Sequence, residues 1–275
     1  MYKQDIKLVV CDIDGSLVTT DHVLTDRAKD VIKRLHEKGI YFGIASGRSI
    51  QQHLSKQAEV WGFDFDFELL IGMNGAEMWD GVHQKRHDYY KLKREWLKEI
   101  IELMAPFDLN PFVYVDGISL YYKVDPSVIE SAKRNKTNYR IVEDVSELYE
   151  KETAKILFRM SEELMVKVEQ YVKAHPSPYY RAFKTQTTVL EFADIRVNKA
   201  VPLISFCKLN GIDLSQVVSF GDMTNDDELL EASGLGVCLL NGSSETKAKA
   251  DAITEKTNDE DGFAYFMEKH FLNNW

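Results

Sequence analysis

Cysteine, long apolar runs and clustered basic residues are all scarce in this chain. The three cysteines, Cys11, Cys207 and Cys238, are odd in number and lie scattered in apolar surroundings. This pattern favours reduced core thiols over disulfides or a cysteine metal cluster. No stretch approaches the roughly 18 apolar residues of a membrane helix, and the amino-terminal residues carry no long apolar signal core. We therefore expect a soluble, cytoplasmic protein with no membrane partner.

The excess of acidic over basic side chains makes nucleic acid an unexpected partner. The formal net charge is −10, and no basic run is longer than a few residues. Surfaces that bind nucleic acid are built from clustered Lys and Arg, because the phosphate backbone dominates their affinity. Material for hydrophobic cores is abundant, since 44% of the 275 residues are hydrophobic. This length and composition allow two globular domains of ordinary size.

Two acidic motifs lie near opposite ends of the chain, and each follows a short apolar run. Residues 12–15 (Asp-Ile-Asp-Gly) follow the run 6–11, and residues 221–226 (Gly-Asp-Met-Thr-Asn-Asp) follow the run 217–220. Both motifs are predicted to be loops at the carboxyl ends of buried strands, where open α/β sheets bind ligands. Carboxylates gathered there repel one another unless a hard cation neutralises them. The pattern predicts one Mg²⁺ site.

Helix and strand patterns alternate after the first motif. Thr25 is predicted to cap a helix that ends at Gly39 and presents an apolar face made of Ala28, Val31, Ile32 and Leu35. Strands are predicted over residues 40–45 and 69–71, and each is followed by a polar loop. A right-handed crossover would return the second strand parallel to the first. Three polar loops should therefore reach one edge of a sheet.

The pattern changes between about Gly81 and Glu191, where aromatic strand candidates alternate with helices. Helices are predicted over residues 94–104 and 162–173, and strands over 112–115, 119–124, 156–160 and 188–192. The parallel pattern resumes near Lys199, with helices over 200–209 and 227–232 and strands over 217–220 and 235–240. We therefore predict a doubly wound α/β core of residues 1–81 and 192–275, interrupted by an α+β domain of residues 82–191.

The first motif carries residues suited to phosphoryl transfer. Asp12, at the end of the first strand, can attack phosphorus and form an aspartyl phosphate, provided that a cation screens the phosphoryl charge. Asp14, two residues on, faces the same side and can protonate the leaving oxygen and later activate water. A metal ion here can take oxygens from Asp12 and Asp222 and the main-chain carbonyl of Asp14. The motif thus predicts both a nucleophile and a general acid and base.

The other polar loops supply candidates for binding phosphate. Ser46 and Gly47 can offer a hydroxyl and backbone N–H groups to phosphate oxygens. Lys199 brings a compact positive charge that can bind phosphate and restrain the Asp12 carboxylate. Asn225 can add a neutral donor, while Asp226 is expected to support metal-bound water or Lys199 rather than to ligate. Every role in phosphoryl transfer therefore has a candidate residue.

In order and spacing, these segments resemble the four motifs of the haloacid dehalogenase superfamily. The segments are residues 12–17 (Asp-Ile-Asp-Gly-Ser-Leu), the tripeptide 46–48 (Ser-Gly-Arg), Lys199 and residues 221–226. The insertion between the second and third motifs resembles a type IIB cap domain, and the turn 74–76 (Asn-Gly-Ala) fits the Cof-type sugar phosphatases. The resemblance covers essentially the whole chain. Two departures, Ser16 where many members carry Thr and Asn198 where Ser is common, leave the expected chemistry unchanged.

The resemblance implies an activity and a set of site residues. It implies a Mg²⁺-dependent phosphatase that acts on sugar phosphates or similar small phosphorylated metabolites, with the cap domain setting substrate specificity. The roles that it implies are Asp12 as nucleophile, Asp14 as general acid and base, Asp12, Asp14 and Asp222 as magnesium ligands, and Ser46, Gly47, Lys199 and Asn225 as phosphate contacts.

Other activities stay open at this stage. A phosphomutase, or a dedicated phosphatase for a disaccharide phosphate, shares this cap architecture, and analysis of the products separates them from a general phosphatase. Outside the enzymes, a metabolite-binding regulator with weak turnover would retain the same phosphate site. The oligomeric state is not indicated by the sequence.

Several further residues have more than one interpretation. Arg48 can pair with acidic residues nearby. His83 and His87 lie four residues apart, as a metal pair on a helix would, but no carboxylate motif accompanies them, so we interpret them as surface residues. Arg181 and Lys184 can contact an anionic substrate. Most aromatic residues of the insertion are expected in its core rather than in a substrate pocket, namely Tyr89, Tyr90, Tyr121, Tyr122, Tyr179, Tyr180 and Phe183.

Overall fold

The computed structural model describes residues 5–124, 126 and 138–272. The first four residues, in which we expect no signal core, lie outside this range. The chain divides into two compact units, which we call the core unit (Met1–Asp88 and Asn198–Trp275) and the inserted unit (Tyr89–Val197). These divisions fall later in the chain than the predicted boundaries at 81/82 and 191/192. The reason is that strand β5 still pairs within the core unit, and strand β11 extends to Asp194 within the inserted unit.

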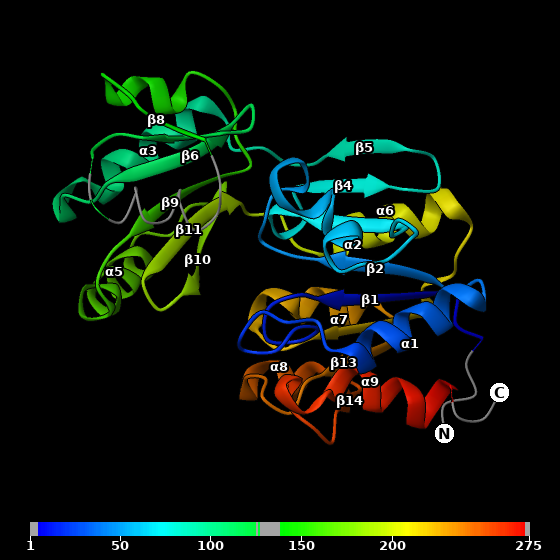
Figure 1. Cartoon of the computed structure of the whole chain (residues 1–275). Coiled ribbons are helices and arrows are strands. Elements are labelled where there is room, and N and C mark those ends of the chain that lie inside the picture. Colours follow the sequence, from blue (N-terminus) through cyan, green and yellow to red (C-terminus); the bar gives the residue numbers. More distant parts are fainter. Residues whose placement is uncertain (1–4, 125, 127–137, 273–275) are drawn as a thin grey trace. The chain divides into compact units, whose positions relative to one another are not determined.

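The core unit is built on an eight-stranded sheet with the order β14-β13-β12-β1-β2-β3-β4-β5 (Figure 1). The six strands from β14 to β3 are parallel, and β4 and β5 are antiparallel at one edge. Only a short turn joins β3 to β4, and such a turn can connect only antiparallel strands. The strands are β1 (Leu8–Asp12), β2 (Tyr41–Ala45), β3 (Leu69–Gly72), β4 (Glu77–Asp80), β5 (Lys85–Asp88), β12 (Val217–Gly221), β13 (Leu235–Cys238) and β14 (Ala252–Ile253).

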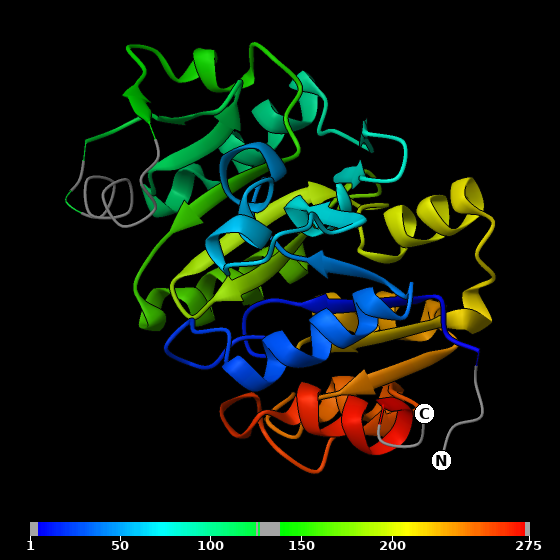
Figure 2. The same ribbon diagram turned by 45° about the vertical axis from the view of Figure 1, so that its right-hand side comes forward.

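Helices cover both faces of this sheet. Helices α1 (Asp26–Glu37) and α9 (Gly262–Met267) pack against one face, whereas α6 (Ala200–Asn210) and α7 (Asp227–Ala232) lie on the other (Figures 1 and 2). The predicted cap of α1 is confirmed, because the Thr25 hydroxyl accepts a hydrogen bond from the Ala28 N–H at 3.1 Å. The shorter helical segments are α2 (Gln57–Val60), α8 (Ser244–Lys249), the π-helices η1 (Ile50–Leu54) and η8 (Glu268–Leu272), and the 3₁₀ turns η2 (Met73–Gly75), η5 (Leu214–Gln216), η6 (Thr224–Asp226) and η7 (Asn258–Glu260).

The predicted apolar face of α1 is the face that becomes buried. Its positions are spaced by three and four residues, which places them on one side of a helix. They pack into a core with residues from the central strands and from α9, including Phe42, Phe220 and Phe263. This packing fixes β1 and β12 in the middle of the sheet, where both acidic motifs begin.

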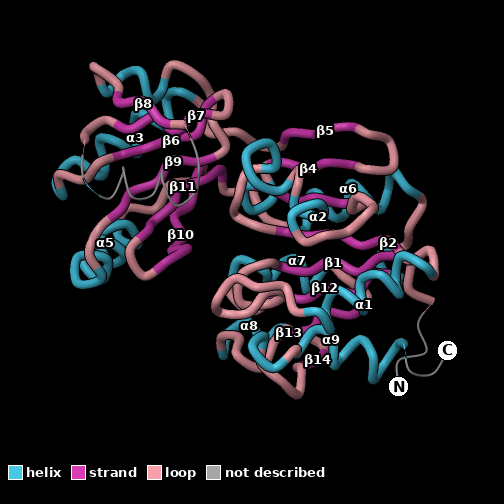
Figure 3. Tube along the Cα trace, in the orientation of Figure 1, coloured by secondary structure: helices cyan, strands magenta, loops and turns pink. Residues whose placement is uncertain are grey.

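The inserted unit is a six-stranded sheet with the order β10-β11-β9-β6-β7-β8 (Figure 3). All neighbouring pairs are antiparallel except β7 and β8. Among the described residues of this unit, helices α3 (Arg94–Met104) and α5 (Glu162–Ala174) pack on the sheet through a core that includes Leu97, Phe158 and Phe192. The other elements in the described part of this unit are η3 (Ala105–Phe107), β6 (Pro111–Val115), β7 (Ile118–Tyr121), β8 (Tyr139–Ile141), η4 (Val145–Tyr149), β9 (Lys155–Arg159), β10 (Tyr180–Gln186) and β11 (Val189–Asp194).

The predicted α/β core with an α+β insertion is confirmed, and the differences are local. Strand β10 and the β4–β5 hairpin are not predicted by the sequence pattern, because charged residues interrupt any apolar run in these segments. They are Arg181 and Lys184 in β10, Glu77 and Asp80 in β4, and Lys85, Arg86 and Asp88 in β5. The predicted strand over 119–124 ends earlier, at Tyr121. His83 and His87 do not share a helix: His83 lies in the turn after β4, 2.8 Å from Asp80, and His87 lies on β5.

The three cysteines and most aromatic residues of the insertion are expected from the sequence to be buried. Cys11, Cys207 and Cys238 are free and buried, as predicted. Among the aromatic residues of the insertion, Tyr121 is buried and Tyr122 and Tyr180 pack partly buried against a core, but Tyr90 and Tyr179 are exposed. Along the described ranges, every helix is too short or too polar to cross a bilayer.

Candidate active site

The acidic motifs meet because their strands are neighbours. Strand β1 pairs in parallel with β12, with Cys11 opposite Phe220, and the next residues along the two strands are Asp12 and Gly221. Parallel neighbours end at the same edge of a sheet, so residues from opposite ends of the chain come into contact. Ser16 demonstrates this contact, since its hydroxyl donates a hydrogen bond to Asp222 Oδ1 at 2.9 Å across 206 positions of sequence.

Three carboxylates form a buried cluster at this edge. Asp12, Asp222 and Asp226 each offer a carboxylate oxygen, and these oxygens all lie within 4.8 Å of one another. The three residues are 7%, 7% and 1% exposed. Oxygen donors at this spacing suit a hard divalent cation. The cluster can therefore hold such a cation. Two of its members, Asp12 and Asp222, belong to the set of ligands predicted from the sequence.

A buried lysine bridges two members of this cluster. Lys199 is fully buried, and its ammonium donates hydrogen bonds to Asp12 Oδ1 and to Asp226 Oδ1. The other oxygen of Asp226 accepts the N–H groups of Asp222 and Met223 at 3.1 and 3.3 Å. Asp226 thus connects Lys199 to the loop that carries Asp222, and its carboxylate is occupied by partners within the chain.

Local capping explains how Lys199 reaches this position. The Asn198 side chain accepts the N–H groups of Ala200 and Val201 at 3.0 and 3.1 Å, which is how a residue caps the amino terminus of a helix. Helix α6 therefore starts directly after Lys199. Asn198 performs this capping although Ser is the residue expected there.

The burial of these carboxylates changes their acidity. Burial raises the pKa of Asp12 well above its usual range, the charge of Asp226 adds to this, and Lys199 opposes it. Burial, with Asp226 as the next contribution, raises the pKa of Asp222 to about 7. Burial acts to lower the pKa of Lys199, but Asp12 and Asp226 outweigh it and the pKa is raised. The lysine therefore stays charged, and a bound cation would offset the repulsion among the carboxylates.

Gly15 allows the first motif to pass close to the second. Its φ of +84° is left-handed, and a Cβ atom at this position would lie 2.4 Å from Asp222 Oδ2. Only glycine combines this conformation with so close an approach. The turn thereby brings the main chain of the first motif against the Asp222 carboxylate.

The carboxylate of Asp14 does not join the buried cluster. Asp14 is exposed, and both of its oxygens accept hydrogen bonds from Arg48 Nη2, at 2.7 and 2.8 Å. His22 Nδ1 lies 3.0 Å from Asp14 Oδ1. In this conformation Asp14 could bind a metal ion only through its main-chain carbonyl, which is the ligand atom proposed from the first motif. Arg48 therefore pairs with Asp14, an acidic partner that the sequence alone did not identify.

The loop after β2 presents Ser46 and Gly47 on a fixed backbone. The Ser46 N–H donates to the Ile71 carbonyl at 2.9 Å, and the Ser46 hydroxyl accepts the Arg48 N–H at 3.2 Å. This leaves the hydroxyl hydrogen of Ser46 able to point toward an acceptor. Asn225 is half-buried on the turn η6, between Asp222 and Asp226 in the chain. Contact of Ser46, Gly47 and Asn225 with phosphate therefore stays a prediction.

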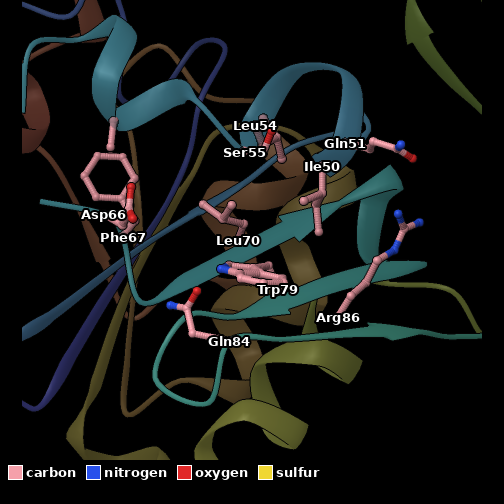
Figure 4. Close-up of a pocket in the computed structure, with 11 residues that line it drawn as sticks. Ile50, Gln51, Leu54, Ser55, Asp66, Phe67, Leu70, Trp79, Gln84 and Arg86 are labelled. Carbon is pink, nitrogen blue, oxygen red and sulfur yellow. The ribbon is translucent and has the colours of Figure 1, made fainter. Parts of the chain in front are cut away.

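The core unit also contains an apolar hollow that is separate from the acidic cluster (Figure 4). Its volume is about 290 Å³, and the side chains around it include Ile50, Phe67, Leu70 and Trp79. None of the carboxylates of the acidic cluster lines it. The acidic cluster, rather than this hollow, is therefore the candidate active site.

Some contacts of the site have little or no signal in the sequence. Ser16 stands out there only as a departure from a motif, yet it binds Asp222. His22 carries no motif signal at all, and its contact with Asp14 depends on how the loop after β1 folds back. Asn74 has a signal in the Asn-Gly-Ala turn, and its amide lies beside Gly47.

Comparisons with known proteins agree with this geometry. A family model for haloacid dehalogenase-like hydrolases matches residues 9–267. The 5-amino-6-(5-phospho-D-ribitylamino)uracil phosphatase YitU of Bacillus subtilis is 26% identical over 276 residues, which cover 96% of this chain and 97% of that protein.

Solved structures share the architecture. A haloacid dehalogenase-like hydrolase from Bacteroides thetaiotaomicron superposes with a TM-score of 0.81 at 25% identity, covering 97% of this chain and all of that one. A subclass IIB sugar phosphatase shares the fold with a TM-score of 0.79 at 22% identity, over 96% of this chain and 98% of its own. The chain thus belongs to the family of haloacid dehalogenase-like hydrolases.

Proposed function

We propose that this enzyme hydrolyses small phosphorylated metabolites with the help of Mg²⁺, through an aspartyl phosphate on Asp12. Its class, a phosphoric monoester hydrolase, agrees with its family and with its phosphatase relative. The proposal adds the metal, the covalent intermediate and the substrate class. One observation carries it: Asp12 lies buried at the end of β1, bound by Lys199, with a carboxylate oxygen within 4.8 Å of carboxylate oxygens of Asp222 and Asp226.

The first step is attack of Asp12 on phosphorus. One oxygen of Asp12 is held by Lys199, and the other oxygen forms the new bond to phosphorus while the bond from phosphorus to the substrate oxygen breaks. Asp14 supplies the proton that the departing alcohol needs. Lys199 and the donors of Ser46 and Gly47 bind the phosphoryl oxygens. Asp12 and Asp222 would help to hold Mg²⁺, which would offset the charge of the carboxylates and of the phosphoryl group.

The second step releases phosphate. Asp14, now deprotonated, takes a proton from water as the water attacks phosphorus, and the bond between phosphorus and Asp12 breaks. The products are the alcohol, inorganic phosphate and the restored Asp12 carboxylate. For either step Asp14 must leave its contacts with Arg48 and His22. We infer that substrate binding opens this pairing.

The inserted unit is proposed to be a cap domain that selects the leaving alcohol. Its separate core and sheet give it the form of a domain that can carry specificity while the core unit carries the chemistry. The relative YitU bears a name that specifies a phosphate on a ribityl chain. We therefore propose phosphorylated sugars, sugar alcohols and related metabolites as the substrate class.

Release of inorganic phosphate from a panel of sugar phosphates, sugar-alcohol phosphates and nucleotides tests the proposal. The panel is run with Mg²⁺ and with EDTA, on the wild type and on Asp12→Asn. Asp64→Asn, which changes an exposed aspartate outside the site, is the matched control. Release that requires the metal, disappears in Asp12→Asn and persists in the control supports hydrolysis through Asp12.

Other results would favour the alternatives. An isomeric sugar phosphate in place of inorganic phosphate would indicate a phosphomutase. Tight binding of a panel member with negligible turnover would indicate a metabolite-binding regulator. Turnover of Asp12→Asn near the wild-type rate would overturn the covalent mechanism.

A further inference from the structure

The turn after β3 has an unusual backbone. Met73, Asn74 and Gly75 follow one another with φ values of 50°, 55° and 108°. A positive φ is uncommon for residues other than glycine, and asparagine is one of the few that tolerate it. Such conformations persist only where the surroundings enforce them, and they cluster at functional sites. The surroundings of this turn therefore indicate its role.

On one side the turn holds the loop of Ser46 and Gly47. The Asn74 N–H donates to the Ser46 carbonyl at 3.0 Å, and the Met73 N–H donates to the Arg48 carbonyl at 2.9 Å. The residues before and after Gly47 are thus both tied to the turn. Any shift of the turn would move the donors proposed to bind phosphate.

On the other side the same turn meets the segment that carries Lys199. A Cβ atom on Gly75 would lie 2.0 Å from the Asn198 carbonyl oxygen and 3.0 Å from the Lys199 nitrogen. The main chain at Gly75 therefore packs directly against the peptide that joins Asn198 to Lys199. One turn fixes two loops that are far apart in the chain.

The side chain of Asn74 is buried beside Gly47. It is 5% exposed, and across the described residues its Nδ2 is buried without a hydrogen-bond partner. A Cβ atom on Gly47 would meet this Nδ2 at 3.3 Å and the amide oxygen at 3.4 Å. A buried donor with no acceptor lowers the stability of a folded chain. Stability alone therefore does not explain an amide at this place.

We propose that Asn74 is a positioning residue of the active site, whose amide packs against Gly47 and fixes the phosphate-binding loop at a cost in stability. The inference rests on the proposed function, because it requires Ser46 and Gly47 to bind phosphate. It predicts opposite effects on two quantities. Removing the amide without straining the backbone should leave the protein no less stable but should weaken its binding of phosphate.

The decisive variant is Asn74→Gly, which accepts a positive φ and lacks the amide. Asn74→Ala also lacks the amide but strains the backbone. Gln84→Ala is the matched control, because Gln84 has a φ of 53° in the turn at the other end of β4. For each protein we would measure Tm, the inhibition constant of inorganic phosphate, kcat and KM, all with Mg²⁺.

The expected pattern separates positioning from a general structural role. Asn74→Gly should keep the wild-type Tm or exceed it, while its inhibition constant for phosphate rises about 10-fold. Asn74→Ala should show the same weakening of phosphate binding together with a lower Tm. Gln84→Ala should lower Tm and leave phosphate inhibition unchanged.

Two results would overturn the inference. One is wild-type phosphate inhibition in Asn74→Gly, and the other is a fall of its Tm in parallel with its phosphate affinity. Failure of the proposed function would be visible separately and earlier, since the wild-type protein would then neither release phosphate from the substrate panel nor be inhibited by it.

Discussion

One nitrogen of Arg48, Nη2, donates to both carboxylate oxygens of Asp14, at 2.7 and 2.8 Å. The residue proposed as general acid and base is therefore paired with a cation at the surface of the core unit, outside the buried acidic cluster. An ion pair of this kind between partly exposed groups is weak in water. It can be exchanged for a contact with substrate at small cost, so the pairing is compatible with a residue that acts only during turnover.

The proposed role of Asp14 predicts a dependence on the leaving group. Asp14→Asn should lower kcat about 10²-fold or more for sugar phosphates, because their alcohols must be protonated as they leave. For 4-nitrophenyl phosphate, whose leaving group departs as an anion, the first step should slow far less. Single-turnover rates measured with both substrates check this. Equal losses for the two substrates would argue against acid catalysis by Asp14.

Lys199 is predicted to serve both folding and catalysis. Lys199→Met would leave Asp12 and Asp226 buried without their shared cation. Removing one partner of a buried ion pair costs about 3–5 kcal/mol, so the free energy of unfolding in urea should fall by that order. Adding Asp226→Asn should recover part of the stability but not the turnover. A single variant as stable as the wild type would contradict the proposed pairing.

Gly15 offers a test of close approach with a matched control. Gly15→Ala should abolish most activity, because the new Cβ would lie 2.4 Å from Asp222 Oδ2. Gly62 has nearly the same φ, +83°, but a Cβ atom there would meet nothing within 4 Å, so Gly62→Ala introduces only backbone strain. We expect Gly62→Ala to cost about 1 kcal/mol and to keep full activity. Comparing kcat/KM and urea unfolding for the two variants checks this.

The acidity of Asp222 predicts how metal binding varies with pH. The pKa of Asp222 is raised from 3.8 to about 7, first by burial and then by Asp226. A metal ion needs the ionised carboxylate, so the affinity for Mg²⁺ should fall as the pH decreases below about 7 and binding should release protons. Calorimetric titrations at about pH 6 and about pH 8, in buffers of different ionisation enthalpy, measure both effects. Affinity independent of pH in this range would contradict a role for Asp222 as ligand.

The raised pKa of Asp222 also determines whether the stability of the metal-free protein rises or falls with pH. A carboxyl group whose pKa is higher in the folded than in the unfolded chain binds more protons when folded between the two values. The contribution of Asp222 to stability without metal should therefore decline as the pH rises from about 4 to about 7. Bound Mg²⁺ should reverse this loss, so the rise in Tm on adding Mg²⁺ should be larger at about pH 8 than at about pH 5.5.

Much of the fold and the candidate site follows from local sequence patterns. The apolar spacing of Ala28, Val31, Ile32 and Leu35 requires only one helix and one hydrophobic face, and the structure buries all four. Asp12 ends one buried strand and Asp222 directly follows its neighbour, so parallel pairing alone brings them to one edge. Such features depend on residues close together in the chain, which is why a single sequence can predict them.

Only the tertiary structure decided which side chains touch. The bridge from Lys199 to Asp12 and Asp226, the pairing of Arg48 with Asp14 and the packing of Asn74 on Gly47 join segments that are far apart in the chain. Their geometry depends on strand register, on the left-handed turn at Asn74 and on which carboxylates are buried. The sequence by itself determined the chemical groups available and the sheet edge at which they gather. Packing and burial determined their partners and their charge, because those depend on every element that surrounds the site.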